Sequence, residues 1–286
     1  MRYGNHTQVA TFNGVNMSVD NSFQLSTAAA ESYENQKVPA IFAPLAKATL
    51  EAIALPENGA IIDLACGTGI IPRLLTEHLP GKGRIVGSDL NPAMIEVARR
   101  TMPETGHSVD WIASDVADLP CEDGEFDMAF VQQGLQFFPE RPAALAEINR
   151  VLAPGGKLVL TVWSSISPFF QAVSDSLKQR VSETAAKQAV GPFSFRDGDV
   201  ISSLLGDTGF TDIAVTQLLI HRPISPVRSA TRAEMLASVY EKELRAKGDA
   251  VIEAVIDDAI GVLEEYRDGD CLMIPQETHL FQAVKP

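Results

Sequence analysis

The chain carries DLACGTG at residues 63–69, between a strand-like and a helix-like segment. These residues end the apolar run AIIDLA at 60–65 and come directly before a stretch with helical spacing at 70–78. Parallel sheets bind ligands at the carboxyl ends of their strands, and glycine lets the backbone approach a ligand closely. With Gly67 and Gly69 in it, this strand-to-helix turn predicts a loop that binds a nucleoside cofactor.

Apolar runs and helical patterns alternate over residues 60–163. The runs predict strands at 60–65, 84–90, 108–114, 126–132 and 157–163, and the patterns between them predict helices at 70–78, 92–101 and 142–152. Nearly continuous apolar strands that alternate with helices are typical of a parallel sheet covered on both faces. We therefore predict an α/β fold for this part of the chain.

Other patterns precede and follow this alternation. Residues 26–33 and 38–53 have a spacing that predicts a pair of N-terminal helices, and residues 1–20 are typical of a loose arm. After residue 163 we expect one long helical stretch at 167–190, a short helix at 197–205, and strands at 213–220 and 272–284, the last broken at Pro275. Two helices are expected within 231–266. This divides the chain into an N-terminal part, 1–57, that covers the site, and a main domain, 58–286, with cap insertions at about 165–195 and 229–267.

The composition excludes several classes of protein. Hydrophobic residues make up 45% of the 286 residues and charged residues 21%, which is ordinary for a globular protein and excludes wholesale disorder. The formal net charge of −14 repels phosphate backbones and anionic lipids, so we expect no nucleic-acid or membrane partner. The three cysteines lack zinc-ligand spacing, so no metal is expected, and the start of the chain has no signal-peptide pattern, which predicts a cytoplasmic protein.

Acidic residues stand at the ends of three successive predicted strands. Asp63 closes the first and Asp89 the second, and Asp115 follows the third together with Val116. At the second position a carboxylate can accept both hydroxyls of a ribose, and the third offers an acceptor for an adenine amino group beside an apolar edge. A dinucleotide loop would need a third small residue where the chain has Pro72, and its pyrophosphate would meet the Asp63 carboxylate. The set suits S-adenosylmethionine, which has an ammonium, a ribose and an adenine but no phosphate.

Residues 60–163 resemble the class I S-adenosylmethionine-dependent methyltransferases. The resemblance rests on an ordered set of motifs: DLACGTG, GSDLNPAMIEVAR, SDVADLP, FDMAFVQQGLQFF and EINRVLAPGGKLVLTVW. It implies a Rossmann-like methyltransferase sheet of seven strands, the last antiparallel, with helical cap insertions. It also implies which residues would contact the methionine part, the ribose and the adenine of the cofactor: Asp63, Ala65, Gly67, Gly69, Asp89, Leu90, Met94, Asp115, Val116 and Gln132.

Within this class the chain is similar to small-molecule methyltransferases of the ubiquinone/menaquinone-like type from bacterial secondary metabolism. Tyr33-Glu34 followed by VPAIFAP, and PQETH at 275–279, fit that group, so the resemblance covers most of residues 30–284. QQGL at 132–135 replaces the Asn/Asp-Pro-Pro-aromatic run of the nucleic-acid enzymes. The region after the fourth strand lacks Asp and Glu until Glu140, which argues against a catechol-type magnesium site.

Five further residues are candidates for contact with a methyl acceptor. Tyr33 could place its aromatic face over a sulfonium cation or could pack in the core. Gln136 could contact the acceptor or occupy a solvated helix position. Trp163, Phe169 and Phe170 could line an apolar acceptor pocket, although aromatic residues at such positions are more often core.

These features predict an enzyme that moves the methyl group of S-adenosylmethionine to an oxygen, nitrogen or carbon of a small, fairly apolar metabolite. Positioning of the acceptor alone could suffice for methyl transfer, whereas a carbon acceptor would need a base such as His279 or Tyr33. Histidines placed like His279 and His221 are more often strand residues with a structural hydrogen bond. One alternative is a cofactor-binding protein of this fold that does not methylate, either cyclase-like or a sensor. A nicotinamide oxidoreductase is another. The sequence leaves open whether the protein is a monomer or a homodimer.

Overall fold

The computed structural model describes residues 11–12, 15–16, 26–79, 83–104 and 107–286. Most of the predicted arm at residues 1–20 lies outside these described residues. Within it, β1 (Thr11–Phe12) and β2 (Val15–Asn16) pair with each other in an antiparallel ladder, separate from the main sheet.

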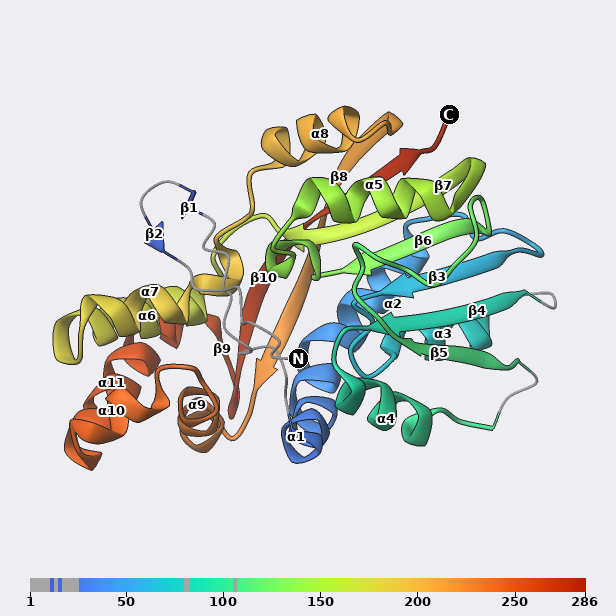
Figure 1. The fold of residues 1–286 in the computed structure, drawn as a ribbon. Coiled ribbons are helices and arrows are strands. Elements are labelled where there is room, and N and C mark those ends of the chain that lie inside the picture. Colours follow the sequence, from blue (N-terminus) through green and yellow to red (C-terminus); the bar gives the residue numbers. More distant parts are fainter. Residues whose placement is uncertain (1–10, 13–14, 17–25, 80–82, 105–106) are drawn as a thin grey trace, which may run out of the picture.

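The main sheet combines the alternating segment with two long strands from the end of the chain (Figure 1). Its spatial order is β5 (Val109–Ala113), β4 (Arg84–Asp89), β3 (Ala60–Leu64), β6 (Phe126–Gln132), β7 (Leu152–Trp163), β10 (Cys271–Val284) and β8 (Thr211–Ile224). The strands from β5 to β7 are parallel, and β10 is antiparallel to both β7 and β8. The short β9 (Arg267–Asp268) pairs with β10. The predicted α/β sheet with an antiparallel last strand is confirmed.

The strand order changes direction between β3 and β6. The chain first adds β4 and β5 on one side of β3, and then returns to add β6 and β7 on the other. Open α/β sheets bind ligands outside the carboxyl ends of the strands at such a crossover. The fold therefore places the 63–69 loop, which follows β3, where a ligand is expected.

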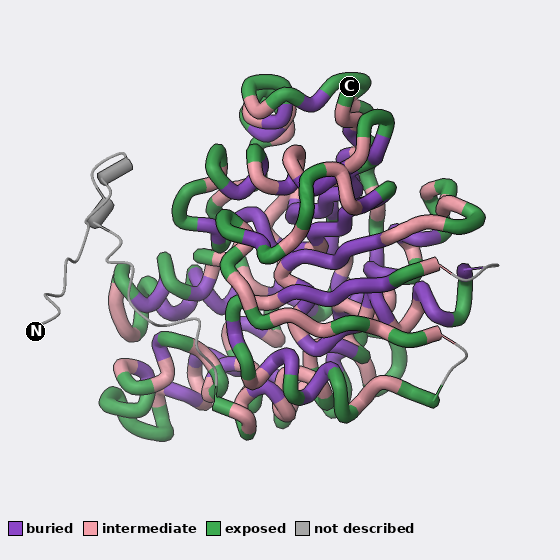
Figure 2. Tube along the Cα trace, turned by 45° about the vertical axis from the view of Figure 1, so that its right-hand side comes forward, coloured by how far each residue is buried: buried purple, intermediate pink, exposed green. Residues whose placement is uncertain are grey.

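Helices bury apolar side chains on both faces of the sheet. On one face, α2 (Ala43–Glu51) and α3 (Ile70–His78) contribute to a core that includes Ala46 and Leu75, and they lie behind the strands in Figure 1. On the other, α5 (Arg141–Val151) and α8 (Gly198–Asp207) contribute residues such as Leu145 and Leu205. Figure 2 shows the central strands as buried over most of their length. This covering explains why the strands lack a polar face.

The predicted pair of N-terminal helices is a single helical run with a wider turn inside it. Here α1 (Thr27–Lys37) passes into the π-helical η1 (Val38–Phe42), which passes into α2 without a loop. Pro39 and Pro44 lack the N–H group that a regular helix uses. Pro39 lies within the π-helical turn, and Pro44 follows it in the first turn of α2. The π-turn keeps Ile41 and Leu45 buried on the side that faces the sheet.

Several predictions for the second half of the chain were wrong in detail. The stretch predicted as one helix at 167–190 is α6 (Pro168–Arg180) and α7 (Glu183–Ala189), because the Ser182 hydroxyl accepts the Ala185 N–H and starts a new helix. Three helices, α9 (Val227–Leu236), α10 (Glu241–Ala246) and α11 (Asp249–Val262), stand where two were predicted. The last strand is not broken at Pro275. Strand β7 ends at Trp163 opposite Thr278, so at Pro275 β10 has no partner on the β7 side and tolerates a missing donor.

The late helices pack against one another beside the ends of β8 and β10. Side chains of α6, α7, α9, α10 and α11 share one apolar cluster with Ile224, Leu272 and Ile274 of the two strands, and Figure 1 shows these helices grouped at one end of the sheet. Among the described residues, no helix is long and apolar enough to cross a membrane.

Candidate active site

The loop after β3 turns sharply and brings the ends of β3 and β4 together. Ala65 and Gly67 have backbone φ angles of 51° and 56°, in the left-handed region that favours glycine. Space is not what restricts Gly67: a Cβ there would lie 3.7 Å from the Tyr33 ring, an ordinary contact. At Gly69 a Cβ would lie 2.4 Å from the Trp111 ring. Gly69 is therefore required by packing against β5, a role that the motif alone does not reveal.

Asp89, at the end of β4, holds this loop in place. Its Oδ2 accepts a hydrogen bond from the Gly67 N–H at 2.8 Å, and its Oδ1 accepts one from the Asn91 N–H at 2.9 Å. Each carboxylate oxygen can accept more than one hydrogen bond, so both keep acceptor capacity for a ligand. The side chain thus ties the two strand ends together and can still face a bound molecule.

A second carboxylate, Asp63, is buried beside Asp89. Its side chain is 1% exposed, and its Oδ1 has no hydrogen-bond partner among the described residues. Burial, and after it the charge of Asp89, raises the pKa of the Asp63 carboxyl well above its ordinary range. Burial also raises the pKa of Asp89 and of the Cys66 thiol. Two buried carboxylates that ionise with difficulty make this a site where a cation would bind favourably.

The N-terminal helical run closes the site from above the loop. A small pocket lies between the run and the strand ends, lined by Tyr33, Val38, Phe42, Asp63, Ala65, Cys66, Thr68, Ile70, Ile71 and Gln132. The Tyr33 ring stacks on Phe42 with 5.2 Å between ring centroids. Gln132, at the end of β6, donates from Nε2 to the Phe42 carbonyl at 3.2 Å, while its buried Oε1 has no partner among the described residues. Tyr33, Asp63, Ala65 and Gln132, all named from the sequence, thus meet in one place.

The residues predicted for the adenine lie at the next strand ends, with different exposures. Leu90 is 55% exposed and available for contact. Met94 is buried and packs with Ala30 and Val97 between α1 and α4. Asp115 is exposed, and its Oδ1 accepts the Ala117 N–H at 2.9 Å in a turn that also contains the half-buried Val116.

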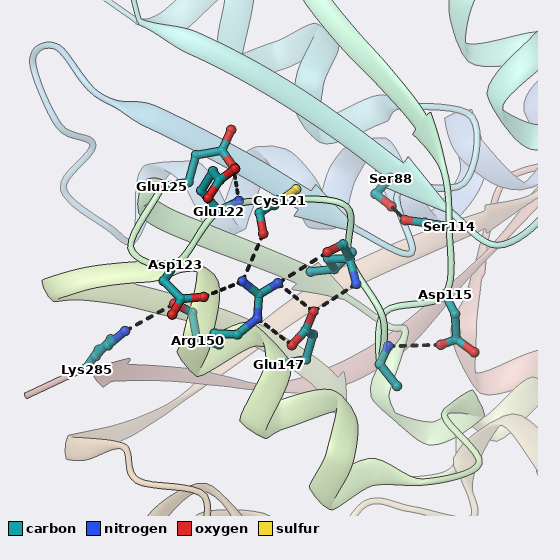
Figure 3. Close-up of polar contacts among 12 residues, drawn as sticks. Ser88, Ser114, Asp115, Cys121, Glu122, Asp123, Glu125, Glu147, Arg150 and Lys285 are labelled. Atoms are coloured by element: carbon teal, nitrogen blue, oxygen red, sulfur yellow. Dashed lines mark hydrogen bonds and ion pairs between the residues drawn. The ribbon is translucent and has the colours of Figure 1, made fainter.

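An ion-pair network fixes the segment that follows β5. Arg150 on α5 donates to the Leu119 and Cys121 carbonyls and pairs with Glu147 and Asp123 (Figure 3). Glu147 in turn accepts the Leu119 N–H at 2.9 Å. Nothing in the motifs indicated this role, which needs the positions of α5 and the loop together. The network holds the turn that carries Asp115 against the body of the sheet.

Other candidates lie outside the pocket. Trp163 is buried against Phe193, with 5.8 Å between ring centroids, and Phe169 is in the core of the late helices with Phe170 against it. His279 packs near Gly198 at the start of α8, and His221 is exposed on β8. Neither histidine lines the pocket.

The region after β6 contains residues that sequence reasoning missed or misplaced. Gln136, for which a solvated position was an alternative, is buried in the short helix η2 (Leu135–Phe137) and donates to Gln133 Oε1 at 3.3 Å. Gln133 was not predicted. It is buried with a left-handed φ of 55°, an uncommon conformation for this residue type that marks functional sites in many proteins.

Arg73 on α3 was also missed. It donates to the Thr68 carbonyl at 2.8 Å and pairs with Glu34 of α1 at 2.9 Å. It therefore links the N-terminal run directly to the loop. A basic residue one turn into the helix after the loop is the only sequence signal, and it does not identify its partner on α1.

A larger hollow of about 420 Å³ lies elsewhere, on the outer side of α4 (Pro92–Thr101). It is lined by Pro92, Ile95, Glu96, Arg99, Arg100 and Ala113, none of which was predicted to contact the cofactor. Because it lacks both Asp63 and Asp89, its size does not make it the better candidate.

Comparison with known proteins agrees with this geometry. A family described as a methyltransferase domain matches residues 61–156. Demethylmenaquinone methyltransferase of Thermus thermophilus is 42% identical over 100 residues, which cover 35% of this chain and 45% of the relative. A ubiquinone/menaquinone biosynthesis C-methyltransferase of a Shewanella species is 27% identical over 184 residues, which cover 59% of this chain and 73% of the relative. The first of these matches thus spans less than half of the relative's length.

A solved methyltransferase structure is similar to this chain in its fold. Phosphoethanolamine N-methyltransferase 2 of Haemonchus contortus, in complex with S-adenosyl-L-methionine, superimposes with a TM-score of 0.58 and 19% identity, covering 92% of this chain and 58% of that one. At this identity the likeness speaks for the fold alone.

The fold, the ordered motifs and these matches agree with one another. Residues 61–156 form a methyltransferase domain, and the chain is similar over part of its length to S-adenosylmethionine-dependent methyltransferases. The relatives named here are of the ubiquinone/menaquinone-like type that the sequence predicted.

Proposed function

We propose that the protein binds S-adenosylmethionine in the pocket beside Asp63 and transfers its methyl group to a small, fairly apolar acceptor. The observation that carries this proposal is the buried Asp63 carboxylate, whose Oδ1 lacks a partner among the described residues next to a second buried carboxylate, Asp89. A ligand with a positively charged amino-acid part satisfies that oxygen and relieves the repulsion between the two carboxylates. A phosphate-bearing dinucleotide would do neither.

The other pocket residues fit the same cofactor. The loop at Ala65 and Gly67 offers backbone without large side chains, and Asp89 keeps acceptor capacity for ribose hydroxyls. Leu90, Asp115 and Val116 supply an apolar and acidic rim for the adenine, and Gln132 Oε1 is free to accept a hydrogen bond from the methionine part.

When bound, the cofactor supplies an activated methyl group, and the chain's own contribution is to position the acceptor and exclude water. Burial, and then the nearby Asp89, Glu34 and Asp63, raise the pKa of the Tyr33 hydroxyl. That phenol stays protonated at neutral pH, so we propose that Tyr33 contributes its ring face to the sulfonium rather than acting as a base. His279 lies against Gly198, away from the pocket, and is a poor candidate for the base as well.

The late helices form part of the proposal. We propose that α6, α7 and α9–α11 act as a cap that, with the N-terminal run, encloses the acceptor. Their shared core with Ile224 of β8 and with Leu272 and Ile274 of β10, and the pair between Lys37 of α1 and Glu234 of α9, support this. The relatives named above act on quinone precursors according to their names, which supports an acceptor with a ring and an apolar body. A role in secondary metabolism stays a prediction.

The test is turnover. Purified protein incubated with S-adenosylmethionine and a set of phenols, hydroquinones and amines should generate S-adenosylhomocysteine, quantified by mass spectrometry, with at least one acceptor. Tight binding of S-adenosylmethionine without turnover on any acceptor or cell-extract fraction would favour a non-methylating member of the fold. Calorimetric binding of NADH, without binding of S-adenosylmethionine, would overturn the assignment of the pocket.

A further inference from the structure

A buried arginine with unused hydrogen-bond donors lies on β8. The Arg222 side chain is 8% exposed, and its Nη2 donates to Glu234 of α9 at 2.6 Å. Its Nε and Nη1, which carry more than half of the guanidinium's N–H groups, have no partner among the described residues. The guanidinium lies over the rings of Phe169 and Phe170, 5.2 and 5.6 Å from their centroids. The rings and Glu234 fix this cation in place and leave donors free.

The charges around Arg222 do not balance. Glu234 also pairs with Lys37 of α1, so two cations share one carboxylate. Burial alone would raise the pKa of Glu234, but Arg222 and Lys37 outweigh it and hold that pKa below its ordinary value. Burial lowers the pKa of Lys37, with Arg222 adding to the effect against the opposing pull of Glu234. A net positive charge in the interior is costly unless an anion accompanies it.

Further buried polar side chains lie on the same face of the sheet as Arg222. On β10, Gln276 is registered opposite Ile220, two residues from Arg222, so Gln276 and Arg222 lie diagonally on the same face. Gln276 is 2% exposed, and neither its Oε1 nor its Nε2 has a partner among the described residues. Two residues further along this face, Thr278 contacts Gln133, with 3.5 Å between Oγ1 and Nε2.

At both ends this group of polar side chains is adjacent in sequence to residues that line the pocket. Gln133 follows Gln132, which lines the pocket, and Lys37 precedes Val38, which also lines it. Ile220, on the same face of β8 as Arg222, packs against Ile41 and Leu45 of the N-terminal run, so the unused donors of Arg222 and Gln276 lie on the face of the sheet that this run covers.

We propose that Arg222, assisted by Gln276, binds a carboxylate of the methyl acceptor. The inference rests on the proposed function and narrows its substrate class to a small molecule with an apolar body and one anionic group. One uncompensated positive charge matches a carboxylate better than a doubly charged phosphate. The Phe169 and Phe170 rings, predicted from the sequence as lining for an acceptor, meet edge to face, and in this proposal they position the arginine that binds it.

The test uses pairs of probes that differ only in charge: hexanoate and hexanamide, 3-phenylpropanoate and 3-phenylpropanamide, 2-naphthoate and 2-naphthamide. Each is titrated calorimetrically into the full chain saturated with S-adenosylhomocysteine. We expect at least one carboxylate to bind about tenfold more tightly than its amide, because hydrogen bonds to charged groups are the stronger ones. Arg222→Met should remove the preference and Arg222→Lys should keep part of it.

The control is Arg180→Met, which breaks the exposed pair between Arg180 of α6 and Asp258 of α11 and should leave the preference unchanged. If Arg222→Met fails to fold, Arg222→Lys and Gln276→Leu provide the test, because both should lower the affinity for the carboxylate probe severalfold. No preference in any pair, or a preference that survives these substitutions, overturns the inference.

Failure of this subsite and failure of methyl transfer remain distinguishable. If S-adenosylhomocysteine forms with neutral acceptors and Arg222→Met leaves turnover and probe binding unchanged, the transferase stands and the carboxylate site falls. If no acceptor is methylated but a carboxylate preference depends on Arg222, the carboxylate site stands and the methyltransferase proposal fails.

Discussion

At the scale of single residues, the site depends on two carboxylates that are expensive to ionise. The Oδ1 of Asp63 has no hydrogen-bond partner among the described residues. Both oxygens of Asp89 accept hydrogen bonds from backbone N–H groups, one of Gly67 in the loop and one of Asn91. The first is therefore held ready for a cation, and the second shapes the loop as well as facing the ligand. This difference predicts different consequences when each is replaced.

Replacing Asp63 with Asn should raise stability and weaken cofactor binding. In the folded chain the pKa of Asp63 is raised above its ordinary value of 3.8, so ionised Asp63 lowers the free energy of unfolding as pH rises through the raised pKa. At neutral pH the Asp63→Asn variant should melt at a higher temperature than the wild type. Its affinity for S-adenosylhomocysteine should fall about 10- to 100-fold, because a charged hydrogen bond is lost.

The pH profile tests the same residue. Because the ligand's ammonium selects ionised Asp63, wild-type affinity should increase with pH through the raised pKa, and Asp63→Asn should flatten that increase. Asp127→Asn, which makes the same charge change at the far end of the sheet, should leave the profile unaltered. A flat wild-type profile would mean that Asp63 does not meet the ligand's cation.

Replacing Asp89 with Ala should cost on the order of 1–3 kcal/mol of cofactor affinity, together with some stability, because two backbone N–H groups lose their acceptor. Asp127→Ala is the matched control, since Asp127 accepts the Ala60 N–H at 2.8 Å at the opposite end of β3. Calorimetry and thermal melts should show both variants destabilised and only Asp89→Ala impaired in binding. Equal dissociation constants for the two variants would remove Asp89 from the site.

At the scale of elements, the strands and helices between residues 60 and 163 could be predicted because each repeats a local pattern. The predicted helices at 70–78 and 92–101 have those bounds in the structure. The late helices could not be predicted in number, since Ser182 and the turns around α10 divide stretches of similar composition. Residues that act across elements, such as Arg73, Arg222 and Trp111, were missed because their partners come from distant parts of the chain.

The N-terminal run is an element whose attachment can be tested. Arg73→Met leaves Glu34 and the Thr68 carbonyl without their partner in a largely buried position, which should cost about 1–3 kcal/mol of stability. Cofactor binding should weaken as well, because the run carries Tyr33 over the loop. The exposed pair between Arg100 of α4 and Glu31 also attaches α1 to the body of the protein, and Arg100→Met should change little. Thermal melts and calorimetry compare the two; similar losses in both would show that the Arg73 link has no special part in closing the pocket.

At the scale of the whole molecule, helices from the N-terminal run and from the late part of the chain contact each other beside the main sheet. Contacts between Lys37 of α1 and Glu234 of α9 join these two groups of helices directly. The −14 net charge argues against nucleic-acid partners, while the buried charge around Arg222 is positive. The net charge of the chain and the local charge around Arg222 thus have opposite signs, and only the structure reveals the second.

The central claim is that the pocket between Tyr33, Asp63 and Gln132 holds the methyl donor. A crystal structure of the protein with S-adenosylhomocysteine tests it most directly. The account predicts that the amino-acid part of the ligand contacts Asp63 and Gln132 and that its ribose hydroxyls contact Asp89. A ligand bound in the hollow beside α4, or one that leaves the Asp63 carboxylate without a contact, would contradict it.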